Sequence, residues 1–382
     1  MYESTFYGAQ ASSSQLDSWT DSGGLDMEFR EFLDSFHHLL EASPRETIGP
    51  ESSYVFMSDL HLGDGGRKDD LAPNRGIVLS ALAEWYLPKG HTLVLNGDIE
   101  DLSKFRYREI REAWKGLYGL LDEFSDSGRL RRILGNHDLA LLARDDYPYE
   151  LSHGLALDWK GRTLFAFHGH QASRFFMEFD YLSEFIVRYL AKPLSIKNTS
   201  ISGDSRRRFR TERRIYRASR RLGIASIAGH THRPLFESLS KYDSLRWSIE
   251  ELLRAWPGAD DLGKTGIEKT IAVYRTELGR LRKHEKALRL STSLYDEGDI
   301  IVPSLFNSGC ATGRHGITAI EIEAGSISLV QWTGTKGPRD YVNLESLDRS
   351  EISETPYARH VLRRAALDEV FARIDLLTPS RD

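Results

Sequence analysis

Five short apolar runs in this sequence each end in residues that can bind a metal ion. The runs cover residues 54–58, 93–95, 130–134, 163–167 and 224–228, and they precede DLH at 59–61, GD at 97–98, GNHD at 135–138, HGH at 168–170 and GHTH at 229–232. Short apolar and β-branched runs bounded by turn residues are typical of buried strands. Six of the thirteen histidines fall in these stretches. We therefore expect an open α/β sheet whose strand ends gather carboxylate and imidazole groups.

The stretch TLVLNGDIED at 92–101 lies at the centre of this pattern. Gly97 allows a sharp turn after the strand, which leaves Asp98 in the space where such sheets bind their ligands. Alone, a Gly-Asp pair indicates a turn. The four other stretches favour a metal site.

The motifs DxH, GDxxD, GNHD, HGH and GHTH, in this order, resemble those of the calcineurin-like metallophosphoesterase superfamily. The resemblance covers about 54–232 and resumes at 306–313, FNSGCATG. It implies an α/β fold, a four-layer αββα sandwich, which here would carry two helical insertions.

The resemblance also implies two divalent metal ions. The first would be bound by Asp59, His61, Asp98 and His232, and the second by Asp98, Asn136, His168 and His230. Imidazole and carboxylate ligands without thiolate favour Mn²⁺, Fe or Zn, and Mn²⁺ is the first expectation. In such a site, a water between the ions is acidified toward hydroxide and attacks phosphorus.

Two further residues acquire catalytic roles from the resemblance. His137 would protonate the leaving oxygen, and Asp101 would hold its imidazole in the required tautomer. The alternative for His137 is a turn residue. Candidate substrate-binding residues are His170, Arg233, Arg207 and Arg210.

Composition limits the other classes of protein. A chain of 382 residues, 40% of them hydrophobic, can form one large domain with insertions. The net charge of −5 excludes a basic surface over the whole chain. The single cysteine, Cys310, cannot form an internal disulfide, and no stretch approaches the roughly 20 apolar residues that cross a bilayer. We therefore expect a cytoplasmic protein, with contact at a membrane surface as an alternative.

The remaining segments suggest the following organisation. Residues 1–24 are rich in Ser, Gly and Asp and predict a poorly ordered tail, and 25–48 predict an N-terminal helix. The core would comprise 49–170, 224–236 and 300–335, with helices over 77–86 and 107–124 and a β-hairpin from 318–322 and 326–332. A helical extension would fill 336–382, with one helix over 356–377.

The first insertion, 171–223, carries nine arginines between 206 and 221. One interpretation is a helical hairpin that packs on the core with a solvated basic face. A second is a cap that supplies arginines to phosphate groups. A basic helix could also contact an anionic membrane or a nucleic-acid backbone.

The second insertion, 237–299, has two helical patterns of apolar residues. They predict a helical hairpin. It would either project from the core and form a homodimer contact, or fold back on the body.

The sequence leaves the substrate open among phosphomonoesters, phosphodiesters and pyrophosphates of small molecules, nucleotides or lipid-linked groups. GHTHRP at 229–234 is similar to the UDP-2,3-diacylglucosamine pyrophosphohydrolase branch, which has an arginine in place of His137 and HGD in place of HGH at 168–170. A nuclease and a non-catalytic adaptor with HGHQ are further alternatives. Every expected ligand position is filled, which favours an enzyme.

Overall fold

The computed structural model describes residues 27–172, 205–286, 300–334 and 337–378. The expected tail at 1–24 and most of the expected first insertion, residues 173–204, lie outside the described residues.

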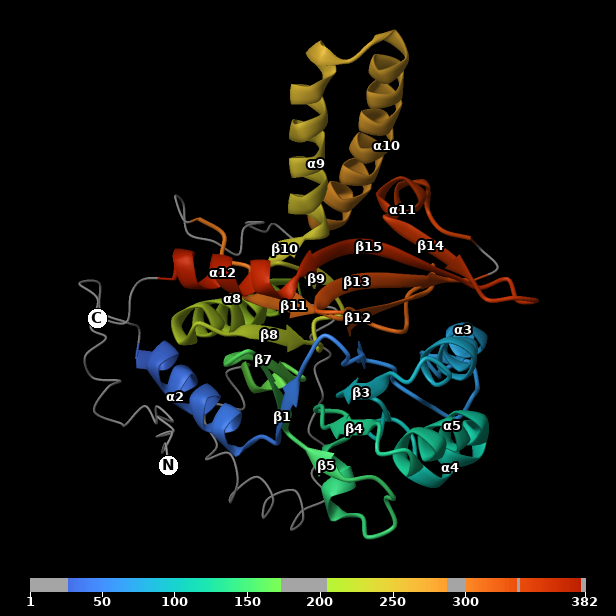
Figure 1. Ribbon diagram of the computed structural model, residues 1–382. Helices are drawn as coiled ribbons and strands as arrows, with labels where there is room; N and C mark the ends of the chain where they lie inside the picture. Colours follow the sequence, from blue (N-terminus) through green and yellow to red (C-terminus); the bar gives the residue numbers. More distant parts are fainter. Residues whose placement is uncertain (1–26, 173–204, 287–299, 335–336, 379–382) are drawn as a thin grey trace, which may run out of the picture.

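Two mixed β-sheets form the centre of the molecule (Figure 1). One has eight strands in the order β14 (Asp348–Glu351), β15 (Ala358–Ala366), β13 (Ser326–Thr333), β12 (Ile317–Glu323), β2 (Tyr54–Met57), β3 (Thr92–Asn96), β4 (Leu130–Ile133) and β5 (Leu151–Ser152). The other has seven in the order β1 (Arg45–Ile48), β6 (Gly154–Trp159), β7 (Arg162–Phe167), β8 (Ala225–Ala228), β11 (Leu305–Asn307), β9 (Leu235–Phe236) and β10 (Leu239–Ser240). Strands β2 to β5 run parallel, as do β7, β8 and β11.

Successive residues of a strand point to opposite faces of the sheet and belong to two different hydrophobic cores. On β2, Tyr54 and Phe56 belong to the core that includes β6 and β7, whereas Val55 and Met57 face a second core. This second core is covered by helices α3 (Arg75–Ser80), α4 (Tyr107–Ala113) and α5 (Lys115–Asp126) and by the π-helix η3 (Ala81–Tyr86). The period of two is the one that pleated strands impose.

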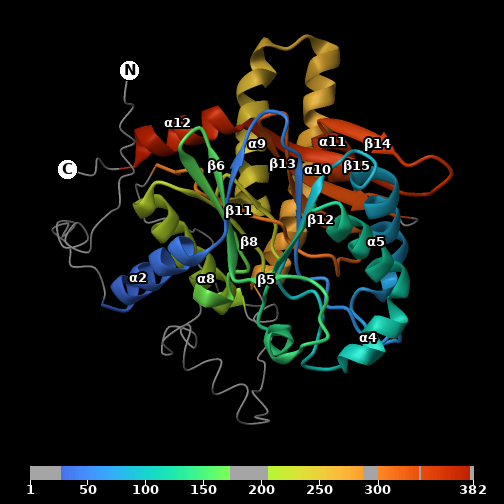
Figure 2. The ribbon, with the colours of Figure 1, turned by 60° about the horizontal axis from the view of Figure 1, so that its bottom comes forward.

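Helices on the far side complete the layers. Helix α2 (Met27–Ala42) buries a row of aromatic and aliphatic residues, and its Phe36 ring lies 5.5 Å from Phe165 and 5.1 Å from Phe167 of β7. Figure 2 shows α2 and α8 (Ser205–Leu222) on one side of the sheets and α4 and α5 on the other. The predicted αββα sandwich is therefore confirmed.

Helix α8, the described part of the first insertion, packs on the body. Its Ile215, Tyr216 and Ala218 are buried, and Arg214 pairs with Glu28 of α2 and donates to the carbonyl of Ala172. These contacts agree with the interpretation of a packed helix.

The second insertion forms the expected hairpin of α9 (Lys241–Ala255) and α10 (Asp261–Lys286). Figure 1 shows both helices projecting from the body. A homodimer contact along the hairpin stays a prediction. In the part of the chain that the structure describes, no helix combines the length and apolarity needed to span a bilayer.

Two expectations about segments near the ends are wrong. The helix expected over 356–377 is split, since 358–366 form strand β15, and only α12 (Leu367–Leu377) is helical. The segment expected as a helix at 25–48 ends in strand β1, which pairs in parallel with β6. Helix α11 (Asp340–Glu345) and strand β14 complete the carboxyl-terminal segment. In both cases pairing with a neighbouring strand overrides local helical preference.

Candidate metal centre

The metal-binding candidates from five strand ends come together at one place. Strands β2, β3 and β4 of the eight-stranded sheet meet β7 and β8 of the seven-stranded sheet there, each at its carboxyl end. Ligand atoms of three groups lie within 4.8 Å of one another: Asp59, His61 and His232; Asp98, His168 and His230; and His61, Asp98 and His137. The first two groups correspond to the two expected metal positions.

Backbone conformation at these positions is unusual. Asp59, His61, Asp98, His230 and His232 all have φ between 51° and 65°, in the left-handed region. Residues other than glycine seldom adopt this backbone conformation, and those that do are often found at functional sites. Each strand end thus turns sharply and directs its side chain toward the centre.

Each of the two carboxylates divides its oxygens between the backbone and the centre. Asp98 accepts from the backbone N–H of His137 through Oδ1 at 2.8 Å, and its Oδ2 lies 3.1 Å from His168 Nε2. Asp59 accepts from the backbone N–H of His230 through Oδ2 at 2.9 Å, and its Oδ1 lies 3.1 Å from His232 Nε2. One oxygen of each group is therefore fixed, and the other faces the histidines.

The histidines are oriented in the same way. His168 Nδ1 lies 2.9 Å from the carbonyl oxygen of Asn96, which can only accept, so Nδ1 carries the proton and Nε2 points at Asp98. Such an outer hydrogen bond fixes the tautomer of a metal ligand. The Nε2 atoms of His61 and His232 converge at 3.1 Å.

Burial and the two carboxylates act in opposite directions on the histidines of the cluster. Burial acts to lower the pKa of His168, but Asp98 and Asp59 outweigh it and raise this pKa to about 9. Burial lowers the pKa of His230 to about 3 and that of His61 to about 4. The pKa of Asp59 falls to about 2, because His232 and His168 outweigh the effect of burial. The carboxylates are thus ionised at neutral pH and two of the imidazoles are held neutral.

Buried polar atoms without partners support the fit to metal ions. Asn136 Oδ1 and His230 Nε2 are inaccessible to solvent and have no hydrogen-bond partner among the described residues. A buried acceptor without a partner is costly unless it binds something else. Both atoms belong to the expected second metal position, so the residues present fit a divalent cation.

His137 and Asp101 form a pair beside the cluster. His137 Nδ1 lies 3.0 Å from Asp101 Oδ1, and the His137 ring packs edge-on against His61 at 4.8 Å. Asp101 also accepts from Ser103 Oγ at 2.5 Å and pairs with Lys104 Nζ at 2.8 Å. Burial acts to lower the pKa of His137, but Asp98 and Asp101 outweigh it and the pKa is raised.

The expected substrate-binding residues have varied positions. His170 is buried, with its ring 5.4 Å from His168, and Arg233 pairs with Glu212 of α8. Arg210 is exposed on α8, and the side chain of Arg207 lies outside the described residues. His170 is buried in the protein and Arg233 is held in an ion pair, so both side chains already have contacts within the protein.

Sequence reasoning missed several residues that support the loops. Ser58 Oγ donates to Asp59 Oδ2 at 2.5 Å. Asp138 accepts from the backbone N–H groups of Gly135 at 2.6 Å and Ile99 at 2.8 Å, and so joins two ligand loops. Ser58 and Asp138 lie next to motif residues, and that proximity is the one signal that the sequence offers for them.

Comparisons with known proteins give the following result. No family model matches the chain, and no curated protein matches it. Among solved structures, the phosphoesterase YfcE from E. coli is similar with 12% identity over 82% of this chain and 99% of that chain, at a TM-score of 0.33. A predicted phosphoesterase from Streptococcus pneumoniae TIGR4 has 13% identity over 81% and 97%, at 0.26, and a dimetal phosphatase from Danio rerio has 10% over 74% and 96%, at 0.29. Because these TM-scores lie below 0.5, the function is inferred below from the side chains of this chain.

Proposed function

We propose that this protein is a metal-dependent phosphoesterase of the calcineurin-like type, which hydrolyses a phosphomonoester, phosphodiester or pyrophosphate bond. One observation carries the proposal. Carboxylate and imidazole groups from the strand ends converge as two adjoining groups, Asp59 with His61 and His232, and Asp98 with His168 and His230, and Asp98 Oδ2 also lies 3.9 Å from His61 Nε2 of the first group. Divalent ions bound by these residues would supply polarisation of a phosphoryl group and activation of water for in-line displacement. Mn²⁺ is the preferred ion of the proposal.

The residues of the chain would contribute as follows. Asp98 would be held by two loops through its backbone and through the N–H of His137, which keeps one oxygen directed at the centre. Asp101 would hold the Nδ1 proton of His137 and leave Nε2 to deliver a proton to the leaving oxygen. Deep burial of His168 and Asp59 would exclude bulk water from the ligand shell.

The test is Asp98→Asn, with Asp126→Asn as a matched control at an exposed carboxylate on α5. We expect Asp98→Asn to lose bound metal and to reduce hydrolysis of 4-nitrophenyl phosphate or bis(4-nitrophenyl) phosphate by at least about 10³-fold, because a shared ligand is lost. Metal content is measured by mass spectrometry and folding by circular dichroism. A folded Asp98→Asn protein with a rate near that of wild type would refute the proposal.

The structure bears unequally on the alternatives. Two arginines of α8 are engaged with the body, Arg214 with Glu28 and Arg217 with the Phe29 ring at 4.2 Å, and neither is available to a nucleic-acid backbone. The complete ligand set argues against a non-catalytic adaptor. The branch that hydrolyses lipid pyrophosphates has an arginine in place of His137. In this chain the position is a histidine that lies within hydrogen-bond distance of Asp101.

A further inference from the structure

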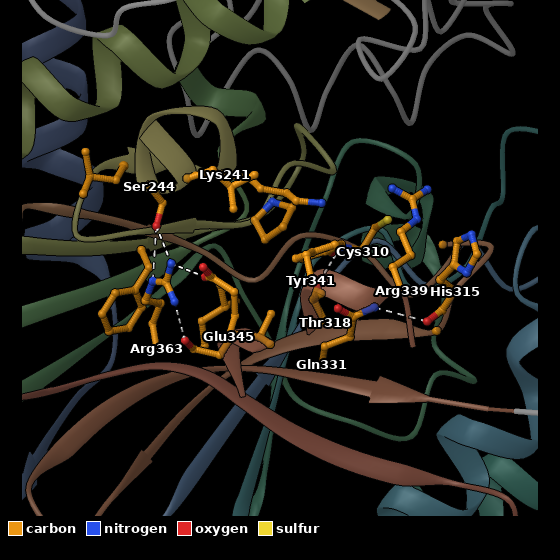
Figure 3. Close-up of a pocket in the computed structure, with 18 of the residues that line it drawn as sticks. Lys241, Ser244, Cys310, His315, Thr318, Gln331, Arg339, Tyr341, Glu345 and Arg363 are labelled. Carbon is orange, nitrogen blue, oxygen red and sulfur yellow. Dashed lines mark hydrogen bonds and ion pairs between the residues drawn. The ribbon is translucent and has the colours of Figure 1, made fainter. Parts of the chain in front are cut away.

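A cavity of about 440 Å³ begins at the metal-ligand candidate His232 and extends away from it. It lies between the base of the α9–α10 hairpin and the strands of the eight-stranded sheet. Figure 3 shows Lys241 and Ser244 of α9 on one side, and Thr318 of β12 and Gln331 of β13 on the other. Its volume falls in the range of small-molecule sites.

The hairpin side of the cavity has more cations than carboxylates to pair with them. Glu277 of α10 is buried, and its carboxylate is shared by Lys241 at 2.5 Å, Arg339 at 2.9 Å and Arg280 at 3.2 Å. Two of these cations, Lys241 and Arg339, line the cavity. One negative charge facing three positive ones leaves an attraction for a further anion.

Arg314 adds a further cation near the metal-binding end. It follows strand β11 in the same loop as Cys310, and both line the cavity together with His232. Within the described parts of the chain, Arg314 is exposed and takes part in no hydrogen bond or ion pair. A ligand could therefore bind this guanidinium without breaking an existing hydrogen bond or ion pair.

The rest of the lining separates polar from apolar surface. Pro234, Leu239, Leu329 and Leu362 supply aliphatic surface, and Tyr341 supplies an aromatic ring over which Lys241 Nζ lies at 3.4 Å. Arg363 is already paired with Glu345 and bonded to Ser244 Oγ at 2.7 Å. An inorganic anion would leave this apolar surface in contact with water, whereas an organic group would cover it.

We propose that this cavity binds the leaving group of the substrate, and that this leaving group is an organic moiety with a partly apolar body and a second phosphate. The inference rests on the proposed function and deepens it. The scissile phosphoryl group would lie at the metal-binding residues beside His232, and the second phosphate would contact Arg314, Arg339 and Lys241. Guanidinium groups match phosphate oxygens in pairs.

Burial of Lys241 agrees with this assignment. Burial lowers its pKa to about 8, although Glu277 acts to raise it. A buried amine with a lowered pKa gains from a nearby phosphate, since an opposite charge favours the charged form. The hairpin thus places Lys241 in the wall of the cavity, with Glu277 paired to it.

The test compares adenosine 5′-monophosphate with adenosine 3′,5′-bisphosphate, which differ only in a second phosphate. For wild type we expect a KM for the bisphosphate about tenfold lower or more, as one charge-assisted contact provides. The double variant Arg314→Gln/Arg339→Gln should lose this difference, so that the ratio of the two KM values falls to about one. Glu277 keeps Lys241 and Arg280 as partners in this variant, so folding is expected to persist. The matched control is Arg30→Gln, at an exposed arginine on α2.

A binding measurement separates the two proposals. Titration calorimetry of adenosine 3′,5′-bisphosphate into the full-length Asp98→Asn protein, with and without the two arginine substitutions, requires no turnover. Arginine-dependent binding, with no hydrolysis of the bisphosphate or of 4-nitrophenyl phosphate by wild type, would overturn the proposed function but would still show that the cavity binds a phosphate through Arg314 and Arg339. Hydrolysis with equal KM values for both substrates, or binding that is unaffected by the two substitutions, would overturn the cavity assignment alone.

Discussion

At the scale of single residues, the pair of His137 and Asp101 separates proton transfer from metal binding. Because Asp101 holds Nδ1, substitution of His137 should spare the metal and slow the departure of a basic leaving group. We expect His137→Ala to lower kcat for an alkyl phosphate by about 10²–10⁴-fold. For 4-nitrophenyl phosphate, whose leaving group needs no proton, the loss should be far smaller. Steady-state rates on both substrates measure the ratio.

The control for this prediction is His38→Ala, at an exposed histidine of α2. Equal losses of His137→Ala on both substrates would contradict the role of a general acid. A loss of bound metal would instead indicate that His137 is itself a ligand, as its grouping with His61 and Asp98 allows.

Gly135, the glycine of GNHD, is a second position at which a single added atom should change the metal site. A Cβ at Gly135 would lie 2.2 Å from Asp98 Oδ1 and 2.3 Å from the Asp98 backbone nitrogen. Gly135→Ala should therefore displace Asp98, lower the metal content and cost about 1–3 kcal/mol in the free energy of unfolding. Gly119→Ala, at an exposed helical site with no atom within 4 Å, should stabilise by about 0.5–1 kcal/mol. Urea unfolding and metal analysis of both variants check this, and full metal content in Gly135→Ala would contradict it.

At the scale of elements, strand β15 shows where sequence patterns fail. Its residues include Arg359, Leu362 and Ala365, which favour helix, and they merge into the genuine helix α12. Pairing along β13 and β14 decides the outcome, and neither partner is near in sequence. The N-terminal strand β1 was missed for the same reason.

A buried ion pair ties this strand to the sheet. Arg359 Nε of β15 donates to Glu321 Oε1 of β12 at 2.9 Å, and Tyr86 donates to the same oxygen at 2.6 Å. Arg359→Met leaves a buried carboxylate without its cation and should lower the free energy of unfolding by about 3–5 kcal/mol. Arg359→Met/Glu321→Met should recover part of this loss, and chemical denaturation measures both. A double variant less stable than the single one would show that the pair is not the cause.

At the scale of the whole molecule, the metal centre and the cavity differ in how far the sequence predicts them. Each ligand follows its own strand within one to four residues, so local motifs give the residue set, and parallel strand ends bring the motifs together. The cavity joins segments near 232–245, 310–331, 339–345 and 362–363, and no sequence motif marks them as parts of one site. Its parts become neighbours only through β15 and the hairpin, and the sequence predicted β15 wrongly.

This division implies that the outer part of the hairpin is independent of the metal centre. Replacement of 247–271 by a short Gly-Ser turn removes the exposed Trp247, Leu253, Trp256 and Leu262 and keeps Lys241 and Glu277. We expect metal content and the rate on 4-nitrophenyl phosphate to stay within about twofold of wild type, because the remaining helical base still packs on α11 and accepts a hydrogen bond from Arg363 of β15 through Ser244. In contrast, Glu277→Gln in the full-length chain should disturb the cation cluster and change KM for adenosine 3′,5′-bisphosphate. Loss of bound metal in the trimmed protein would show that the hairpin supports the metal centre. The contacts of the seven ligand residues argue against such support.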